Sequence, residues 1–184
     1  SGASPKRVIA TSTEDAGQHW SPPARIALAN PDAAISGVAL PGGRILAVLN
    51  NTEEGRDALS LVVSADDGAT WKTVHQLENQ QGIRIEPARY AQTAGDLAKA
   101  TEASIADATG YAKSAQRNKC EAQNLQQASG QNCGFEFSYP YLIQARNGDF
   151  HLVYTWNRSF IKHVRFTPAW LDQQMEKAKD AQLH

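Results

Sequence analysis

One eight-residue pattern occurs twice in this chain and constrains its fold more than any other feature of the sequence. The template is [Ser/Thr]-x-Asp-x-Gly-x-x-Trp, and each copy begins where an apolar run ends. The copies lie about fifty residues apart, a period typical of repeated structural units. The template positions are Thr13, Asp15, Gly17 and Trp20 in the first copy and Ser64, Asp66, Gly68 and Trp71 in the second.

Each residue type in the pattern suits a tight turn between two strands. The Asp and Ser/Thr side chains can hydrogen-bond to backbone groups of the turn, and glycine permits the left-handed backbone conformation. The Trp ring can pack under the hairpin. For Asp66-Asp67-Gly68 a calcium loop is the alternative, but the Asp-x-Asp-x-Asp-Gly pattern and its distal Glu are missing. The repeat therefore predicts structural hairpins.

The sequence around both copies consists of short apolar or alternating runs, which is typical of antiparallel β-structure. Turn signals separate the runs, most clearly Pro41-Gly42-Gly43 and Asn147-Gly148-Asp149. The predicted strands are Val8–Ser12, Ala24–Leu28, Gly37–Leu40, Arg44–Leu49, Leu59–Ser64, Lys72–Leu77, Tyr139–Ala145, Phe150–Trp156 and Ile161–Phe166.

Two parts of the chain have helical character instead. Between residues 79 and 135 the composition changes to Ala, Gln, Lys and Ser, with small residues at helical spacing. This predicts a helical insertion. The tail from Ala169 to Leu183 predicts a C-terminal helix, with Pro168 at its start. We therefore divide the chain into residues 1–78, 79–135, 136–168 and 169–184.

The composition excludes several classes of function. Lys plus Arg number 18 and Asp plus Glu 19, so no charged surface points to nucleic acid or an anionic membrane as a partner. No apolar run approaches the roughly 20 residues that span a bilayer. Cys120 and Cys133 lack the spacing of a zinc site, and we expect no metal or cofactor. In an exported protein these cysteines would form a disulfide; two free thiols are the alternative.

The two octapeptides resemble the Asp-boxes of sialidase-like β-propellers, and the similarity extends through FSYPYLIQARNGDFHLVYTWNRSFIKHVRF near the C-terminus. The resemblance implies an all-β fold, a fragment of a six-bladed propeller whose blades are four-stranded antiparallel sheets. The chain would supply about two and a half blades, one of them complete from Ala34 to Glu78. The other blades would come from an upstream segment, a second chain or a symmetry mate, because an open stack leaves bare sheet edges.

The same resemblance assigns two central site residues. Arg56 matches the position of an arginine that binds the substrate carboxylate, a task for which a planar guanidinium is suited. Its alternative is a loop arginine paired with Glu53, Glu54 or Asp57. Tyr139 matches the position of a tyrosine nucleophile, and its alternative is an aromatic side chain that lines the channel.

Three further residues, Tyr141, Trp156 and Arg158, are candidates for contacting the sugar.

In an antiparallel blade, Arg56 and Tyr139 would share the face opposite the Asp-boxes. The insertion at residues 79–135 would emerge on that face as a cap pinned by the cysteines. A remote surface decoration or an oligomer contact is the alternative for the insertion.

These features imply a retaining exo-glycosidase of the sialidase type that acts on terminal sugars. The resemblance places it in the periplasm or outside the cell. The family's acid/base Asp, the Glu that activates its tyrosine and two more arginines would lie upstream, so this chain alone should be inactive. A non-catalytic carbohydrate-binding propeller is the alternative.

Overall fold

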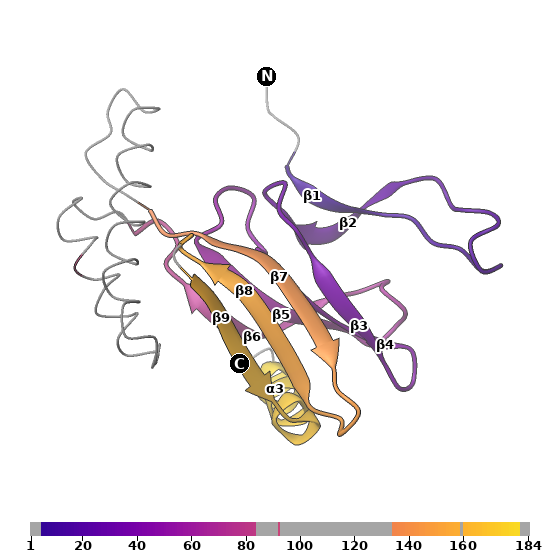
Figure 1. Ribbon diagram of the computed structural model, residues 1–184. Helices are drawn as coiled ribbons and strands as arrows, with labels where there is room; N and C mark the ends of the chain where they lie inside the picture. Colours follow the sequence, from indigo (N-terminus) through magenta and orange to yellow (C-terminus); the bar gives the residue numbers. More distant parts are fainter. Residues whose placement is uncertain (1–4, 84–91, 93–133, 159, 181–184) are drawn as a thin grey trace.

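The computed structural model describes residues 5–83, 92, 134–158 and 160–180. These ranges contain nine β-strands and the helix α3 (Figure 1). All nine predicted strands are present, with ends that differ from the prediction by no more than two residues. The strands are β1 (Arg7–Ala10), β2 (Ala24–Ala29), β3 (Ser36–Leu40), β4 (Arg44–Leu49), β5 (Ala58–Ser64), β6 (Lys72–Asn79), β7 (Phe137–Gln144), β8 (Phe150–Trp156) and β9 (Phe160–Phe166).

The strands form three antiparallel sheets in which sequence neighbours are also neighbours in space. Their orders are β1-β2, β3-β4-β5-β6 and β7-β8-β9. Gly148, with a φ of 89°, makes the predicted turn between β7 and β8. Meanders of this kind are the blades of a propeller, and the predicted all-β fold is confirmed as a partial β-propeller.

Successive sheets pack face to face, and the middle sheet is covered on both sides. Strand β5 is buried at every position. Leu59 and Leu61 belong to a core shared with Leu152 of the third sheet, whereas Val62 packs with Leu28 of the first. Because fully burying one such side chain is worth about 1.5–3 kcal/mol, the middle sheet joins its two neighbours into one body.

The outermost sheet faces instead expose apolar side chains. Ile9, on β1, is 66% exposed, and Tyr141 and Ile161, on the far face of the third sheet, are 65% and 64% exposed. No further sheet covers either face within the described ranges. The stack thus has the one complete and two partial blades that the sequence predicts.

The two Asp-box turns repeat one set of hydrogen bonds. In both, the first hydroxyl accepts from the glycine N–H, the Asp carboxylate accepts from the backbone N–H four residues later, and the Trp indole N–H donates to the glycine carbonyl. These distances are 3.0, 2.9 and 3.1 Å in the first turn and 2.8, 2.8 and 2.9 Å in the second. Both glycines have a φ of 91°. The prediction of structural hairpins is confirmed.

The same bonds lower the pKa of both Asp-box carboxyls, because a hydrogen bond to the charged form favours it. For Asp15 the backbone N–H of His19 is the largest cause, and the pKa falls to about 2. For Asp66 the hydroxyl of Thr70 is the largest cause. Each carboxylate therefore stays ionised and stabilises its own turn.

Helix α3 (Pro168–Asp180) follows β9 directly and lies near β6. The N–H of Trp170 donates to the Thr167 hydroxyl at 3.2 Å, which caps the first turn. The Trp170 ring also packs on Phe166, with centroids 5.1 Å apart. The predicted C-terminal helix is thus present; it begins one residue earlier than expected, and residues 181–184 lie outside the described ranges.

The predicted helical insertion falls almost entirely outside the described residues, as do Cys120 and Cys133, so the cap and the disulfide stay predictions. At its start the boundary shifts slightly, because β6 extends through Asn79. Within the described ranges, no helix has both the length and the hydropathy needed to cross a bilayer.

Candidate active site

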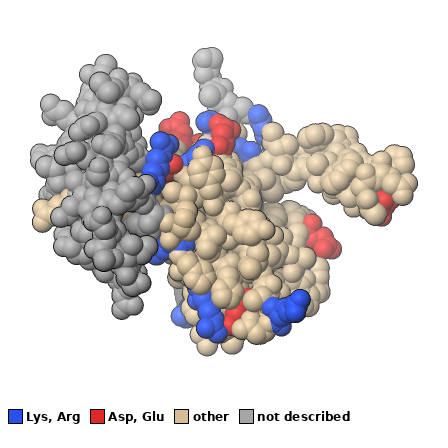
Figure 2. All heavy atoms as spheres, viewed as in Figure 1, with Lys and Arg blue, Asp and Glu red and all other residues tan. Residues whose placement is uncertain are grey.

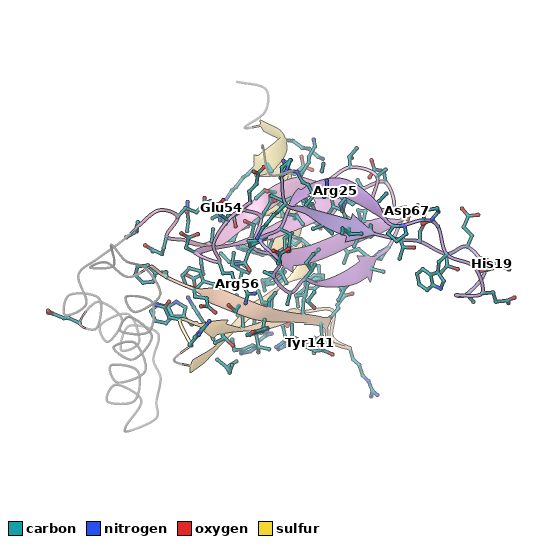
Figure 3. All side chains as sticks on the ribbon, turned by 90° about the horizontal axis from the view of Figure 1, so that it is seen from above. His19, Arg25, Glu54, Arg56, Asp67 and Tyr141 are labelled. Carbon is teal, nitrogen blue, oxygen red and sulfur yellow. The ribbon has the colours of Figure 1, made fainter. Side chains whose placement is uncertain are left out.

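Two hydrogen bonds join the segment before β5 to the start of β7, and a third fixes the amide that makes one of them. The Phe137 N–H donates to the Arg56 carbonyl at 2.7 Å. The side-chain amide of Asn50, which is fully buried, donates to the carbonyls of Ala58 at 2.6 Å and Phe137 at 2.9 Å. These bonds bring together the two segments that carry the predicted site. Figure 3 shows Arg56 at the end of the sheets opposite the Asp-box residues Asp67 and His19.

The guanidinium of Arg56 faces the ring of Tyr139, so the predicted pair is brought together. The guanidinium carbon lies 5.7 Å from the ring centroid, which is within range of a cation–π interaction. One nitrogen of the guanidinium donates to the Asp32 carbonyl at 3.1 Å. The expectation that Arg56 and Tyr139 share one face is confirmed.

No carboxylate of the described ranges forms an ion pair with Arg56, although three lie close in sequence. Glu53 pairs with Arg7 at 2.6 Å, and Asp57 is buried and accepts a hydrogen bond from the Gly82 N–H at 3.1 Å. Within the described ranges, Arg56 therefore does not form the ion pair with a neighbouring carboxylate that was its alternative. Acidic and basic groups nevertheless gather at this end of the sheets (Figure 2).

Tyr139 projects from a local irregularity in β7. The register of β7 against β8 shifts between Ser138 and Tyr141, and Tyr139 has a φ of 55°. This left-handed conformation costs a non-glycine residue about 1–2 kcal/mol. Ser138 and Pro140 are buried on either side, while Tyr139 is 66% exposed. The irregularity therefore presents the phenol to solvent.

A largely buried carboxylate, Glu136, lies at the same end of β7, and the sequence analysis missed it. Arg158 donates from Nε to both of its oxygens at 3.1 and 3.0 Å, and the Ser138 hydroxyl donates to Oε1 at 2.8 Å. The hairpin register could have found this pair. A regular hairpin in which Gln144 pairs with Phe150 would put residue 136 opposite residue 158; with the shift in β7, Phe137 pairs with Trp156 and Glu136 lies beside Asn157, one residue before Arg158. Arg158 is thus engaged through Nε while its side chain remains largely exposed.

Tyr141 and Trp156, both predicted to contact a sugar, have opposite environments. Tyr141 is exposed on the far face of the third sheet. Trp156 is 3% exposed and packs 6.4 Å from the Phe135 ring and 6.2 Å from the Phe137 ring, between centroids. As a correction, we assign Trp156 to the core, because a buried ring has no free face for stacking on a sugar.

A second polar group links β6 to the third sheet. Both the Tyr154 hydroxyl and the Lys162 ammonium donate to Glu78 Oε1, the latter at 2.6 Å. Burial, and then the bond to Glu78, raise the pKa of Tyr154 far above its ordinary value, so this phenol stays protonated.

No cluster of three or more His, Cys, Asp or Glu in the described ranges is arranged to hold a metal ion.

Stacked antiparallel meanders with Asp-box turns at one end define a class of protein, the Asp-box β-propellers. A family model for the BNR repeat-like domain matches residues 1–152. The chain therefore belongs to the BNR repeat-like family, which is sialidase-like or glycosidase-related and includes glycoside hydrolases. No curated protein matches the sequence closely enough to count as a relative.

Proposed function

We propose that this chain forms one side of the active site of a sialidase-like retaining exo-glycosidase. The observation that carries the proposal is the Arg56 guanidinium, which has no ion-pair partner in the described ranges and lies 5.7 Å from the ring of exposed Tyr139. A guanidinium can hold a sugar carboxylate by two parallel hydrogen bonds. A neutral phenol avoids the repulsion that an anionic nucleophile would meet at such a sugar.

In the proposed reaction the phenol oxygen of Tyr139 attacks the anomeric carbon while the bond to the leaving-group oxygen breaks. A carboxylic acid gives its proton to that oxygen, and a second carboxylate takes the phenol proton. Water, deprotonated by the first group, then attacks the anomeric carbon, the bond to the Tyr139 oxygen breaks, and the second group returns its proton to that oxygen, so the sugar leaves with retained configuration. We assign both carboxylates to blades outside residues 1–184, so this chain alone is expected to be inactive.

The test uses the complete propeller and a panel of chromogenic α-glycosides with and without a carboxylate on the sugar. Tyr139→Phe should lower kcat by about a thousandfold or more, because the covalent step is lost. Arg56→Ala should impair the acidic substrates more than the neutral ones, and Arg56→Lys should rescue them only in part. Tyr141→Phe is the matched control. Unaltered turnover by Tyr139→Phe would rule out the nucleophile assignment.

A carbohydrate-binding propeller without catalysis is the second candidate. Tyr139 and Tyr141 are both exposed near the start of β7, and exposed aromatic rings can pack on apolar sugar faces. Sugar binding by the complete assembly, measured by calorimetry, with no turnover of any glycoside would favour this function.

We also propose that another blade of the same protein packs against the first sheet. Trp71 packs on the cluster that joins the first two sheets, beside Val62 and Ile26. Trp20 occupies the same place in the same turn, yet it is 59% exposed. A preceding blade would cover Trp20 as β1 and β2 cover Trp71. Acrylamide should quench Trp20 fluorescence in residues 1–184 and much less in the complete protein, with Trp20→Phe identifying the signal.

The cap and the export of the protein remain proposals. Strand β6 ends, and β7 begins, at the end of the sheets that carries Arg56, so residues 80–136 leave and return on that face. Deleting residues 84–131 from the complete enzyme should broaden its substrate range, and unchanged specificity and stability would contradict the cap. Thiol counting under denaturing conditions tests the pairing of Cys120 with Cys133 that export predicts.

A further inference from the structure

Two histidines on neighbouring strands of the third sheet bring ring nitrogens into contact. His151, on β8, and His163, on β9, are diagonal neighbours in the ladder, because the residue opposite His151 is Arg165, two positions beyond His163. Nδ1 of His151 lies 3.0 Å from Nε2 of His163. The two rings are stacked, with centroids 5.2 Å apart and planes 7° apart. The sheet thus joins two nitrogen ligands that are 12 residues apart in the sequence.

The histidine pair lies on the far face of the third sheet, the face that carries Tyr141 and Ile161. His163 is exposed and His151 is half-buried, and no further sheet covers this face within the described ranges. The cation opposite His151 in the ladder, Arg165, donates from Nε to the Asp149 carboxylate at 2.8 Å. That carboxylate offsets the positive charge beside the pair, so a second cation is less strongly repelled there.

The distance between the two nitrogens matches one class of metal geometry better than another. With metal–nitrogen bonds of about 2.0–2.1 Å, two ligand nitrogens lie about 2.8–3.0 Å apart when the bonds meet at a right angle, and about 3.3–3.4 Å apart at the tetrahedral angle. The observed 3.0 Å agrees with the right angle. Square-planar and tetragonal sites with such angles are typical of Cu²⁺ and Ni²⁺.

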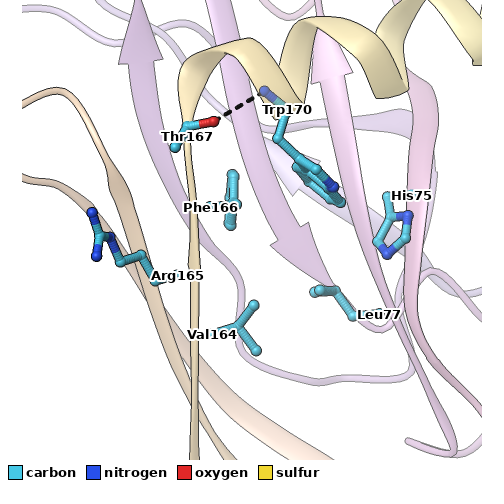
Figure 4. A pocket seen from close by; sticks show the side chains of 7 residues that line it. All are labelled: His75, Leu77, Val164, Arg165, Phe166, Thr167 and Trp170. Atoms are coloured by element: carbon cyan, nitrogen blue, oxygen red, sulfur yellow. Dashed lines mark hydrogen bonds between the residues drawn. The ribbon is translucent and has the colours of Figure 1, made fainter.

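The other two histidines of the described ranges contact groups other than imidazole. His19 is bonded through Nδ1 to the Asp15 carboxylate in the first Asp-box. His75 lines a pocket of about 400 Å³ between β6, β9 and α3, and its ring contacts the Trp170 ring edge to face at 4.9 Å (Figure 4). These two residues therefore serve as matched controls for the pair.

We propose that His151 and His163 bind one divalent transition-metal ion, Cu²⁺ or Ni²⁺, through Nδ1 and Nε2. Each imidazole carries its proton on its other ring nitrogen, so that both ligand nitrogens present a lone pair. The bound ion cross-links β8 to β9, and water fills the coordination positions that face away from the sheet. The sequence predicted no metal from the spacing of its cysteines, whereas this site arises from the register of two strands. The proposal is independent of the glycosidase activity.

The experiment uses residues 1–184 and four single variants. His151→Ala and His163→Ala each remove one ligand, and His19→Ala and His75→Ala are the controls. Ni²⁺ binding is measured by isothermal titration calorimetry in a buffer that does not coordinate metals. The number of nitrogens bound to Cu²⁺ is read from the hyperfine pattern in electron paramagnetic resonance. Thermal unfolding without metal shows whether each variant is folded.

We expect His151→Ala and His163→Ala each to weaken Ni²⁺ binding about tenfold or more, since even the outer-shell partners of metal ligands are worth about 10–100-fold. The control variants should stay within about twofold of the unmodified chain. Cu²⁺ should show two bound nitrogens in the unmodified chain and lose one in either ligand variant. At a hundredfold excess of Ni²⁺ over Kd, the thermal midpoint of the unmodified chain should rise by about 5 °C or more.

Three results would overturn the proposal. The first is Ni²⁺ affinity that survives in both ligand variants, and the second is an equal loss in His19→Ala or His75→Ala. The third is a Cu²⁺ spectrum of the unmodified chain with fewer than two nitrogens, which does not depend on how any variant folds.

Discussion

Replacing the buried amide of Asn50 should destabilise the protein and loosen the site together. Its side chain is fully buried and donates to the carbonyls of Ala58 and Phe137, one in each of two packed sheets. Asn50→Ala leaves both carbonyls without this donor. A buried polar group left unsatisfied costs about 1–3 kcal/mol, and two carbonyls lose their donor. Removal of Asn50 Oδ1, which is buried without a partner in the described ranges, offsets part of that cost, so we expect a loss of about 2–5 kcal/mol in the free energy of unfolding. That is a large part of the roughly 5–15 kcal/mol that holds a typical domain together.

Equilibrium urea unfolding measures this loss, provided that the m value stays unchanged. Asn50→Asp separates hydrogen bonding from packing, because it keeps the volume but replaces the donating nitrogen with a carboxylate oxygen that faces both carbonyl oxygens. It should therefore cost at least as much as Asn50→Ala. Asn79→Ala, at an exposed asparagine, is the control and should change stability by about 0.5 kcal/mol or less.

A structural consequence should accompany the change in stability. Exchange of the Phe137 amide, which donates to Arg56, should become faster in Asn50→Ala, since the same inter-sheet contact is weakened. If Asn50→Ala lost less than about 0.5 kcal/mol, or if Asn50→Asp were fully stable, the reasoning that this amide joins the two sheets would be refuted.

Three further outcomes follow from the other contacts. The Asp66 carboxyl has a lowered pKa in the folded state. Its contribution to stability is therefore present above the ordinary Asp pKa of about 4 and is lost as the pH falls through the folded value. In Asp66→Asn the thermal midpoint should fall less steeply between neutral and acidic pH. Tyr154→Phe should cost about 1–3 kcal/mol in urea unfolding, because the phenol donates to Glu78 from a buried position, and Tyr141→Phe should cost almost nothing. Gly68→Ala should cost about 1–2 kcal/mol through its positive φ, since the added Cβ would make only ordinary contacts at 3.7 Å; an unchanged midpoint would contradict that strain.

The turns and the strands could be predicted because their causes are local. The hydrogen bonds of each Asp-box join groups within eight consecutive residues, so the octapeptide alone implies them, and they form twice with nearly equal distances. The same holds for the turn at Gly148, whose positive φ suits glycine. Alternating apolar residues then gave nine strands close to their observed bounds.

The details of the site depend on contacts between distant segments and could not be predicted in the same way. Trp156 and Tyr141 both looked like sugar contacts, yet one packs in the core and the other faces solvent. Trp156 is buried because β8 alternates regularly and every second residue from Phe150 to Trp156 faces the core. Tyr141 is exposed because the register of β7 shifts between Ser138 and Tyr141, and one residue of register changes which side of a strand is buried.

The two Asp-box tryptophans show most directly which features the local sequence determines and which depend on the tertiary structure. Trp20 and Trp71 occupy the same position of one octapeptide and make the same bond to a glycine carbonyl, so local chemistry was enough to determine the turn around each. Their burial differs because only Trp71 has a neighbouring sheet to pack against within the described ranges. Likewise, the apposition of Arg56 and Tyr139 arises from two sheets docking through Asn50 and Phe137, contacts between segments more than eighty residues apart.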